Sequence, residues 1–345
     1  MKRVLITGGG GYIGSVLVPI LLSRGYTVKV LDRFFFGQNT LPIHSNLEIV
    51  VGDTRRIQID DLKSIDLVID LAAISNDPSG ELFESATWAI NHLARVRCAV
   101  LAKQAGVQRY VIPSSCSVYG FQSDDTVSDE TSPTNPLTTY AKANLAAEQD
   151  VLKLSNDTFG VTVARQATVY GYSRRMRFDL AINGMTYGAW KTGHLPLMRD
   201  GSQWRPMIHV VDTSLALIHM LEADLDDVRG QILNVGSEAN VYQIGRLGRI
   251  VAELAPGDID IEWYGDPDER SYRVAFDKIE ATGWKAEKSA EDGVTEIVAA
   301  LERGDTDRTT ETITLDWYKS LVRYKGLLED IVLDDSLVDL PEDTA

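Results

Sequence analysis

Cysteines, basic residues and long apolar runs are scarce in this chain. It has two cysteines, Cys98 and Cys116, in 345 residues, too few for a disulfide framework and without the spacing of a metal site. No apolar run reaches the roughly 20 residues that span a membrane. Asp and Glu total 50 against 34 Lys and Arg, a net charge of -16, whereas nucleic-acid binding needs clustered basic side chains. We therefore expect no metal, no membrane and no nucleic-acid partner.

The length and apolar content are sufficient for a large folded core. A chain of 345 residues that is 44% hydrophobic suggests one large domain or about two ordinary ones. It begins directly with an apolar, strand-like run and shows no secretory leader pattern, so a reducing, cytoplasmic location is expected. Residues 328–345 are acidic and contain no Lys or Arg, which we interpret as a solvated tail.

A glycine-rich turn lies between a strand pattern and a helix pattern near the start of the chain. The apolar run of residues 1–7 precedes Gly8-Gly9-Gly10-Gly11-Tyr12-Ile13-Gly14, and residues 15–24 have helical spacing. Such a turn lets backbone N–H groups approach a pyrophosphate at the helix N-terminus. The next apolar run ends in Asp32, and an acid about 20 residues beyond the turn accepts hydrogen bonds from ribose hydroxyls. This pattern predicts NAD, although Arg33 could instead hold a 2′-phosphate.

Strand-like and helix-like segments alternate up to residue 171. Further strands are expected at 47–51, 67–71, 109–113 and 161–165, and helices at 82–105 and 140–154. This alternation predicts an α/β fold with a Rossmann-type doubly wound parallel sheet, in which ligands bind at the carboxyl ends of the strands.

After residue 171 the alternation loosens. Residues 174–191 look basic and helical, and 232–235 resemble a late strand that returns to the sheet. We expect residues 1–171, with a returning segment around 205–236, to form an NAD-binding domain. A smaller, partly discontinuous substrate lobe would comprise 172–204 and 237–303, followed by a C-terminal extension, 304–345.

The spacing of Gly8, Gly11 and Gly14, with Thr7 before it and Tyr12-Ile13 inside it, resembles the extended short-chain dehydrogenase/reductase superfamily, in particular its nucleotide-sugar epimerase/dehydratase branch. The resemblance extends to about residue 301. It implies NAD as cofactor, a nucleotide-diphosphate sugar as substrate, and a homodimer.

The resemblance also implies which residues bind the cofactor. Asp53 follows a strand; by itself it could cap the next helix, and the resemblance favours a contact with adenine. Small residues after the strand at 67–71 would let the backbone approach the diphosphate. The full expected set is Gly8, Gly11, Tyr12, Ile13, Gly14, Asp32, Arg33, Asp53, Thr54, Leu71, Ala72, Ala73, Ser114, Tyr140 and Asn144.

Two segments carry the chemistry that the resemblance implies. Ser115 matches the family Ser or Thr that hydrogen-bonds the sugar oxygen, and Tyr140 matches the tyrosine of Tyr-x-x-x-Lys, whose phenolate takes the proton of the sugar hydroxyl. Related 4,6-dehydratases have Asp-Glu directly after the position of Ser115. This chain has Cys116 and Ser117 there, which argues against water elimination by that mechanism.

Asn144 stands where the pattern has its lysine, so Tyr140, Ser115 and Asn144 form the expected catalytic set. Lys142 is not a substitute, because two helical steps rotate it about 200° away. Three interpretations stay open: Tyr140 relies on the nicotinamide cation and nearby dipoles, a lysine reaches in from elsewhere, or the redox step is slow or absent. We expect Asn144→Lys to move activity toward neutral pH.

The second half contributes the substrate residues that the resemblance implies. Arg205 lies in the segment 201–212 and would bind the substrate diphosphate or ribose, while His209 in the same segment is interpreted as structural. The full expected set is Ser115, Ser117, Tyr140, Asn183, Arg205, Arg270 and Arg273.

The leading functional prediction is an NAD-dependent nucleotide-sugar epimerase that acts at C4 through a 4-keto sugar. One alternative is an NAD(P)H-dependent 4-ketoreductase of a deoxysugar pathway. Another is a nucleotide-sugar-binding protein with little turnover, because of Asn144.

Overall fold

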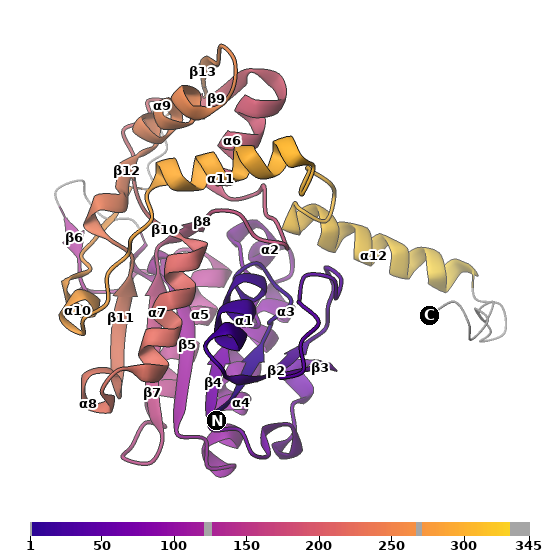
Figure 1. The fold of residues 1–345 in the computed structure, drawn as a ribbon, viewed down its shortest axis with the longest axis vertical. Helices are drawn as coiled ribbons and strands as arrows, with labels where there is room; N and C mark the ends of the chain where they lie inside the picture. The colour runs from indigo at the N-terminus through magenta and orange to yellow at the C-terminus, as the bar shows by residue number, and fades with distance from the viewer. Residues whose placement is uncertain (1, 121–125, 267–270, 332–345) are drawn as a thin grey trace.

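A seven-stranded parallel sheet forms the centre of the computed structural model, which describes residues 2–120, 126–266 and 271–331 (Figure 1). The strand order is β11-β7-β5-β4-β1-β2-β3, and every pairing is parallel. The predicted Rossmann-type sheet is thus confirmed, and the late strand joins it at one edge. The strands are β1 (Arg3–Thr7), β2 (Thr27–Asp32), β3 (Leu47–Val51), β4 (Leu67–Asp70), β5 (Arg109–Ser115), β7 (Gly160–Gln166) and β11 (Gln231–Val235).

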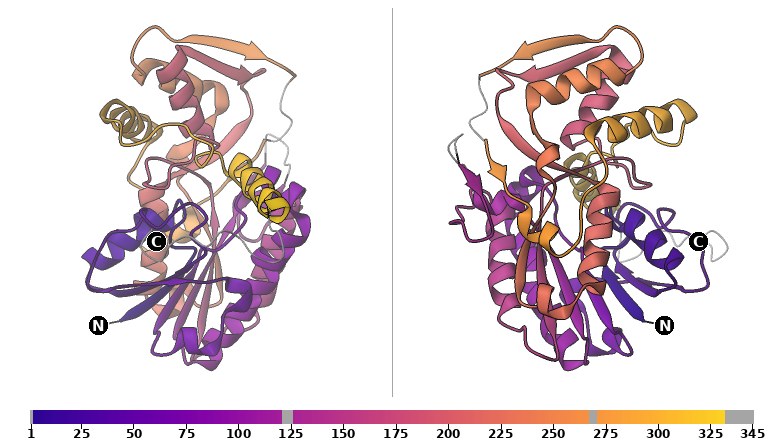
Figure 2. Two further views of the ribbon diagram at one scale, coloured as in Figure 1. Left: turned by 90° about the vertical axis from the view of Figure 1, so that its right-hand side faces the viewer. Right: turned by 60° about the vertical axis from the view of Figure 1, so that its left-hand side comes forward.

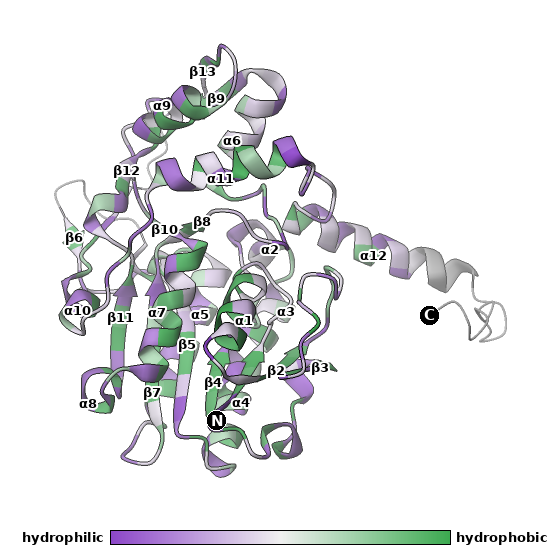
Figure 3. Ribbon diagram, viewed as in Figure 1, coloured by the Kyte–Doolittle hydropathy of each residue, from purple (hydrophilic) through white to green (hydrophobic). Residues whose placement is uncertain are grey.

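Helices cover both faces of the sheet because successive strand residues point to opposite sides. Val4 and Ile6 pack in one apolar cluster with α1 (Gly14–Ser23) and α7 (Val210–Glu222). Leu5 packs on the other face with α4 (Arg95–Gln104) and α5 (Thr139–Leu152). Figure 3 shows the central strands as largely hydrophobic. The connectivity reverses between β4 and β1, which is where doubly wound sheets bind ligands.

A smaller lobe stands on one end of the sheet in both views of Figure 2. Its helices α6 (Ala181–Thr192), α9 (Ile244–Leu254) and α11 (Ala290–Arg303) share a separate apolar cluster. Its strands are β9 (His194–Met198) with β13 (Asp260–Tyr264), and a three-stranded sheet of β8 (Thr168–Tyr170), β10 (Trp204–His209) and β12 (Val241–Gln243) adjoins it. The domain boundaries given above stay a prediction.

The remaining elements are short, apart from the C-terminal helix α12. Two-residue strands β6 (Val127–Ser128) and β14 (Arg273–Val274) pair with each other. The other helices are α2 (Asp77–Leu82), α3 (Glu84–Thr87), α8 (Leu225–Val228), α10 (Asp277–Ala281) and α12 (Thr314–Ile331). In Figure 1, α12 extends away from the rest of the molecule.

The long helix predicted for 82–105 is interrupted. Phe83 adopts a non-helical backbone conformation (φ -118°, ψ 49°) between α2 and α3. The chain then passes through a π-helical stretch, η3 (Trp88–Ala94), before α4 begins at Arg95. Within η3, the buried Asn91 side chain exchanges two hydrogen bonds with the backbone of Ile74, at 2.8 and 2.9 Å.

The helix predicted for 174–191 begins only at Ala181. The buried side chain of Asn183 explains the difference, because it holds the preceding segment as a loop. Its Oδ1 accepts from the Gly171 N–H at 2.9 Å, and its Nδ2 donates to the Arg177 carbonyl at 2.9 Å. Arg175 and Arg177 therefore lie on irregular backbone.

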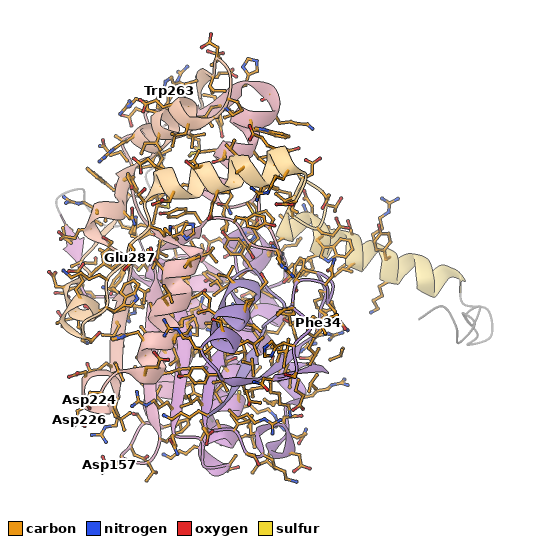
Figure 4. The ribbon with its side chains drawn as sticks, viewed as in Figure 1. Phe34, Asp157, Asp224, Asp226, Trp263 and Glu287 are labelled. Atoms are coloured by element: carbon orange, nitrogen blue, oxygen red, sulfur yellow. The ribbon has the colours of Figure 1, made fainter. Side chains whose placement is uncertain are left out.

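Among the residues that the structure describes, no helix is long and apolar enough to cross a membrane, and no cluster of His, Cys, Asp and Glu could hold a metal ion. Within the same residues Cys98 and Cys116 are both free and buried. Asp157, Asp224 and Asp226 lie at the end of the molecule opposite the smaller lobe (Figure 4).

Candidate active site

A cavity of about 730 Å³ opens where β1, β2, β4 and β5 end. This volume is in the range of small-molecule and cofactor sites. Most of the residues singled out from the sequence line it: Gly8, Gly11, Tyr12, Ile13, Gly14, Asp32, Arg33, Asp53, Thr54, Leu71, Ala72, Ala73, Ser114, Ser115, Ser117, Tyr140 and Arg205. The folding of the sheet thus brings segments from most of the chain to one site.

The glycine turn has the geometry that close approach of a diphosphate requires. Gly8 has a φ of +67°, and a Cβ there would lie 2.8 Å from the Ala72 backbone. A Cβ on Gly11 would meet only the Gly8 carbonyl within 4 Å, so a side chain there would project into the cavity. The turn therefore leaves backbone exposed beside the N-terminus of α1, and it fits a dinucleotide diphosphate.

The side chains of Asp32 and Arg33 have different hydrogen-bond partners. The carboxylate of Asp32 accepts from the Gly10 N–H at 2.9 Å and from the Phe34 N–H at 2.7 Å. Burial raises its pKa, and these backbone bonds oppose the shift. Arg33 donates to Asp53 at 2.8 Å. Asp53 also accepts from the Arg55 N–H at 3.0 Å. It therefore caps the short 3₁₀ helix η1 (Thr54–Arg56) and also lines the cavity.

Tyr140 and Ser115 meet at the cavity wall. Ser115 ends β5, and Tyr140 lies in the first turn of α5, which Thr138 caps by accepting from the Ala141 N–H at 3.2 Å. Both side chains line the cavity, and the Ser115 hydroxyl is near enough to the Tyr140 phenol to influence its pKa. Burial raises the pKa of Tyr140; the charge of Arg95 is the strongest opposing influence, Asp77 adds to the rise, and Ser115 and Arg177 lower it.

Asn144 lies behind this wall and is not among the described residues that line the cavity. Its side chain is 1% exposed. Its Oδ1 accepts from Arg95 at 3.1 Å, and its Nδ2 donates to the Tyr140 carbonyl at 3.1 Å. Both ends of the amide are thus engaged by the protein, and Arg95 lines the cavity instead.

Of the remaining residues expected to bind substrate, Arg205 lines the cavity, whereas Asn183 and Arg273 do not. Arg205 lines the cavity with its guanidinium 5.5 Å from the Tyr272 ring centre. Asn183 is fully buried, and its amide is bonded to the loop that precedes α6. Arg273 stacks over Trp204 at 5.1 Å, and neither it nor Asn183 is among the described residues at the cavity. Arg270 lies outside the described residues.

His209 has the structural position expected for it. Its side chain is fully buried, its Nε2 lies 2.7 Å from a Glu296 carboxylate oxygen, and its Nδ1 accepts from the Val211 N–H at the start of α7. The dehydratase positions also carry no acid. Cys116 is buried and donates to the Arg165 carbonyl at 3.3 Å, and burial raises its thiol pKa.

A basic pair to which the sequence analysis gave no individual role also lines the cavity. Arg177 pairs with Asp179 at 2.9 Å, and Arg175 stacks 3.6 Å from the ring centre of Phe36. Burial, reinforced by the charge of Arg177, lowers the pKa of Arg175 to about 9. An anion in the cavity would therefore be stabilised by these side chains. The run of basic residues from Arg174 to Arg177 was the only signal in the sequence.

Helix α12 also contributes to the cavity, through Tyr318, Leu321 and Val322. It packs on the loop after β2: the Trp317 indole donates to the Phe35 carbonyl at 2.6 Å, and the Tyr318 ring lies 5.8 Å from that of Phe36. Phe34 of this loop is labelled in Figure 4, on the side from which α12 extends. No periodicity or motif in the sequence pointed to this contact.

Comparisons with known proteins give a consistent family. A protein of Methanocaldococcus jannaschii, provisionally named UDP-glucose 4-epimerase, is 27% identical over 318 residues, which cover 86% of this chain and 97% of that protein. A 3-beta-hydroxysteroid dehydrogenase of Mycolicibacterium neoaurum is 28% identical over 257 residues, 71% of this chain and 69% of that protein. The substrates named for these relatives thus differ.

Solved structures share the fold. MoeE5 in complex with UDP-glucose and NAD has a TM-score of 0.77 and 29% identity, covering 88% of this chain and 100% of that chain. The model of the NAD dependent epimerase/dehydratase family matches residues 4–236, which include the glycine turn, Ser115, Tyr140 and Arg205. This chain belongs to the NAD-dependent epimerase/dehydratase family.

Proposed function

We propose that this protein is a nucleotide-sugar epimerase that inverts C4 of the sugar through a 4-keto intermediate. The observation that carries the proposal is the meeting of Ser115 and Tyr140 at the wall of a cavity that also reaches the glycine turn and Arg205. The complex of MoeE5 with UDP-glucose and NAD supports a nucleotide sugar as the substrate.

The residues present fit the family cofactor. The backbone around Gly11 would receive the diphosphate of NAD, and Asp32 would accept from a ribose hydroxyl with the lone pairs that its two backbone bonds leave open. Bound NAD supplies a hydride acceptor and, in the reverse step, a hydride donor.

The protein's own contribution is to hold the sugar and move its proton. Tyr140 Oη takes the proton of the C4 hydroxyl and later returns it to the same oxygen, after the keto sugar has presented its other face. The Ser115 hydroxyl donates a hydrogen bond to the sugar oxygen or to the phenolate. Arg205 holds the substrate diphosphate, and Cys116 and Ser117 offer no carboxylate for water elimination by the mechanism of the related 4,6-dehydratases.

The test is incubation of the purified protein with UDP-hexoses, dTDP-hexoses and a dTDP-4-keto-6-deoxyhexose, each with and without added NADH or NADPH, followed by NMR of the products. A C4 epimer formed without added cofactor supports the proposal. Product formed only with NADH or NADPH indicates a ketoreductase, and tight binding without product indicates a binding protein.

NAD should bind at least tenfold more tightly than NADP. A 2′-phosphate would meet the charge of Asp32, and Arg33, which pairs with Asp53 at 2.8 Å, would have to leave that partner to compensate; tenfold corresponds to about 1.4 kcal/mol. Calorimetry with both cofactors measures the ratio. Arg33→Ala is the matched variant and should leave it nearly unchanged. Equal affinities would contradict the role given to Asp32.

Arg205→Ala should weaken nucleotide-sugar binding by about ten- to hundredfold and leave NAD affinity intact. Loss of a charge-assisted hydrogen bond costs roughly 1.5–3 kcal/mol. Titration calorimetry with UDP and with UDP-glucose measures the change. Arg249→Ala, which removes an exposed arginine from α9, is the control. Wild-type affinity in Arg205→Ala would show that Arg205 does not contact the diphosphate.

Tyr318→Ala should weaken NAD binding by about two- to tenfold. Tyr318 lines the cavity, and its ring lies 5.8 Å from Phe36 and 6.1 Å from Phe83. Such aromatic pairs contribute about 0.5–1.5 kcal/mol, so losing them should loosen α12 at the cofactor site by a similar amount. Fluorescence titration with NAD measures the affinity. Lys319→Ala, on the exposed side of α12, should behave as wild type. An unaffected Tyr318→Ala would mean that α12 is not part of the cofactor site.

A further inference from the structure

Arg95 is a buried cation at the cavity, behind Tyr140. It is 3% exposed and lines the cavity from the first turn of α4. Its guanidinium donates to the carbonyls of Pro113 at 2.8 Å and Asp70 at 3.3 Å, and to Asn144 Oδ1 at 3.1 Å. These three acceptors carry no net charge. The buried carboxylate of Asp70 accepts from the Thr7 and Tyr110 hydroxyls and is not paired with Arg95. Burying an arginine without an ion-pair partner is costly.

Asn144 joins this guanidinium to Tyr140. Asn144 and Tyr140 are one helical turn apart on α5, so their side chains share a face of that helix. The Asn144 amide donates to the Tyr140 carbonyl at 3.1 Å while its oxygen accepts from Arg95. Asn144 therefore holds the Arg95 guanidinium beside the helix position at which the family pattern has its lysine.

The other charged groups around Tyr140 do not replace Arg95. From α2, Asp77 accepts from the Thr138 hydroxyl at 2.6 Å and Glu81 accepts from the Thr139 N–H at 2.6 Å, and both are negative. Arg177 is paired with Asp179 at 2.9 Å. On α5 itself, Glu148 is paired with Arg165.

We propose that Arg95 supplies the positive charge that allows Tyr140 to act as the base, and that Asn144 positions its guanidinium. The inference rests on the proposed epimerase chemistry. A fixed cation nearby favours the phenolate over the phenol, and the low polarity of the buried site strengthens the interaction. Arg95 acts on Tyr140 only through its position and charge, and it transfers no proton itself.

The proposal reverses the expectation for Asn144→Lys. A lysine at this buried site would remove the acceptor of Arg95 and place an ammonium group beside its guanidinium. The single substitution should therefore reduce activity and stability. Lysine should become useful at position 144 only when Arg95 is replaced as well.

The test compares pH–rate profiles of the wild type, Arg95→Met, Arg95→Lys and the double variant Arg95→Met/Asn144→Lys. Met keeps much of the apolar volume and removes the charge. We expect Arg95→Met to be at least tenfold slower at pH 7, with its rise in kcat displaced by about one pH unit or more to the alkaline side. Arg95→Lys and the double variant should recover most of the wild-type profile. A wild-type profile in Arg95→Met would overturn the proposal.

A second measurement needs no substrate. Tyrosine labelled with ¹³C at Cζ reports the ionisation of Tyr140 by NMR, assigned by comparison with Tyr140→Phe. Arg95→Met should raise the pKa of Tyr140, whereas Arg95→Lys, which keeps the positive charge, should raise it much less. An unchanged Tyr140 titration would overturn the role of Arg95 whether or not any sugar is turned over. Failure of the epimerase assay together with a shifted titration would instead remove the proposed function alone.

Discussion

Tyr140→Phe should lower kcat by about 10²- to 10⁴-fold, the usual contribution of a positioned general base. The substitution removes one oxygen from the cavity wall and keeps the ring, so nucleotide-sugar and NAD affinities should change only a few-fold. Turnover measured by NMR, together with calorimetry for both ligands, separates the two effects. A loss of binding with unchanged kcat would assign Tyr140 to substrate recognition instead.

A tyrosine outside the cavity provides the matched control. Tyr187 lies on α6 and donates to Asp307 at 2.9 Å, and it is not among the described residues that line the cavity. Tyr187→Phe should retain wild-type turnover. If both variants lost activity equally, the effect of Tyr140→Phe would not be specific to the base.

The direction of the pH dependence follows from the same residue. Burial raises the pKa of Tyr140, with Arg95 as the strongest opposing influence, and the phenolate is the form that accepts a proton. The oxidation half of the reaction should therefore accelerate as pH rises through neutrality. This acceleration should be absent from any residual activity of Tyr140→Phe.

Glu148→Gln should lower the free energy of unfolding by about 3–5 kcal/mol, the typical cost of removing one partner of a buried ion pair. Glu148 and Arg165 are paired at 2.8 Å, with side chains 1% and 4% exposed. The glutamate also accepts from the Ser114 hydroxyl. After the substitution, the charge of Arg165 would remain buried beside the aromatic ring of Tyr119 without a compensating carboxylate. Urea denaturation measures the loss.

The same helix offers a control with an exposed pair. Asp150 lies 2.8 Å from Lys153, with side chains 41% and 72% exposed, and exposed pairs contribute about 0–1 kcal/mol. Asp150→Asn also affects the contact with His92, yet it should cost far less than Glu148→Gln. Similar losses in the two variants would show that burial does not govern the strength of the Glu148–Arg165 pair.

Local patterns in the sequence were sufficient for the sheet and for one side of the cavity. Short continuous apolar runs indicate the buried strands of a parallel sheet, in which every strand ends at the same edge. Gly8, Asp32 and Ser115 therefore come together whatever the details of the packing. Tyr140 follows from the helix that begins directly before it. These placements depend on short-range periodicity and on the order of the elements, whereas the roles given to Ser115 and Tyr140 came from the resemblance to a known family.

Contacts between segments far apart in the sequence determine the other side of the cavity. Asn144 is next to Arg95 only because α4 and α5 pack side by side on one face of the sheet, and nothing in the residues around either one indicates the other. Asn183 lies in the first turn of α6, and its side-chain amide stabilises the preceding loop, which carries Arg175 and Arg177.

Helix α12 reaches the cavity by packing on a loop almost three hundred residues earlier, where Trp317 bonds Phe35. The sequence by itself thus determined the fold, the cofactor turn and the Ser115–Tyr140 pair. Only the tertiary structure decided which cation stands behind Tyr140 and which segments close the cavity, because side-chain hydrogen bonds between remote elements leave no periodic trace in the chain.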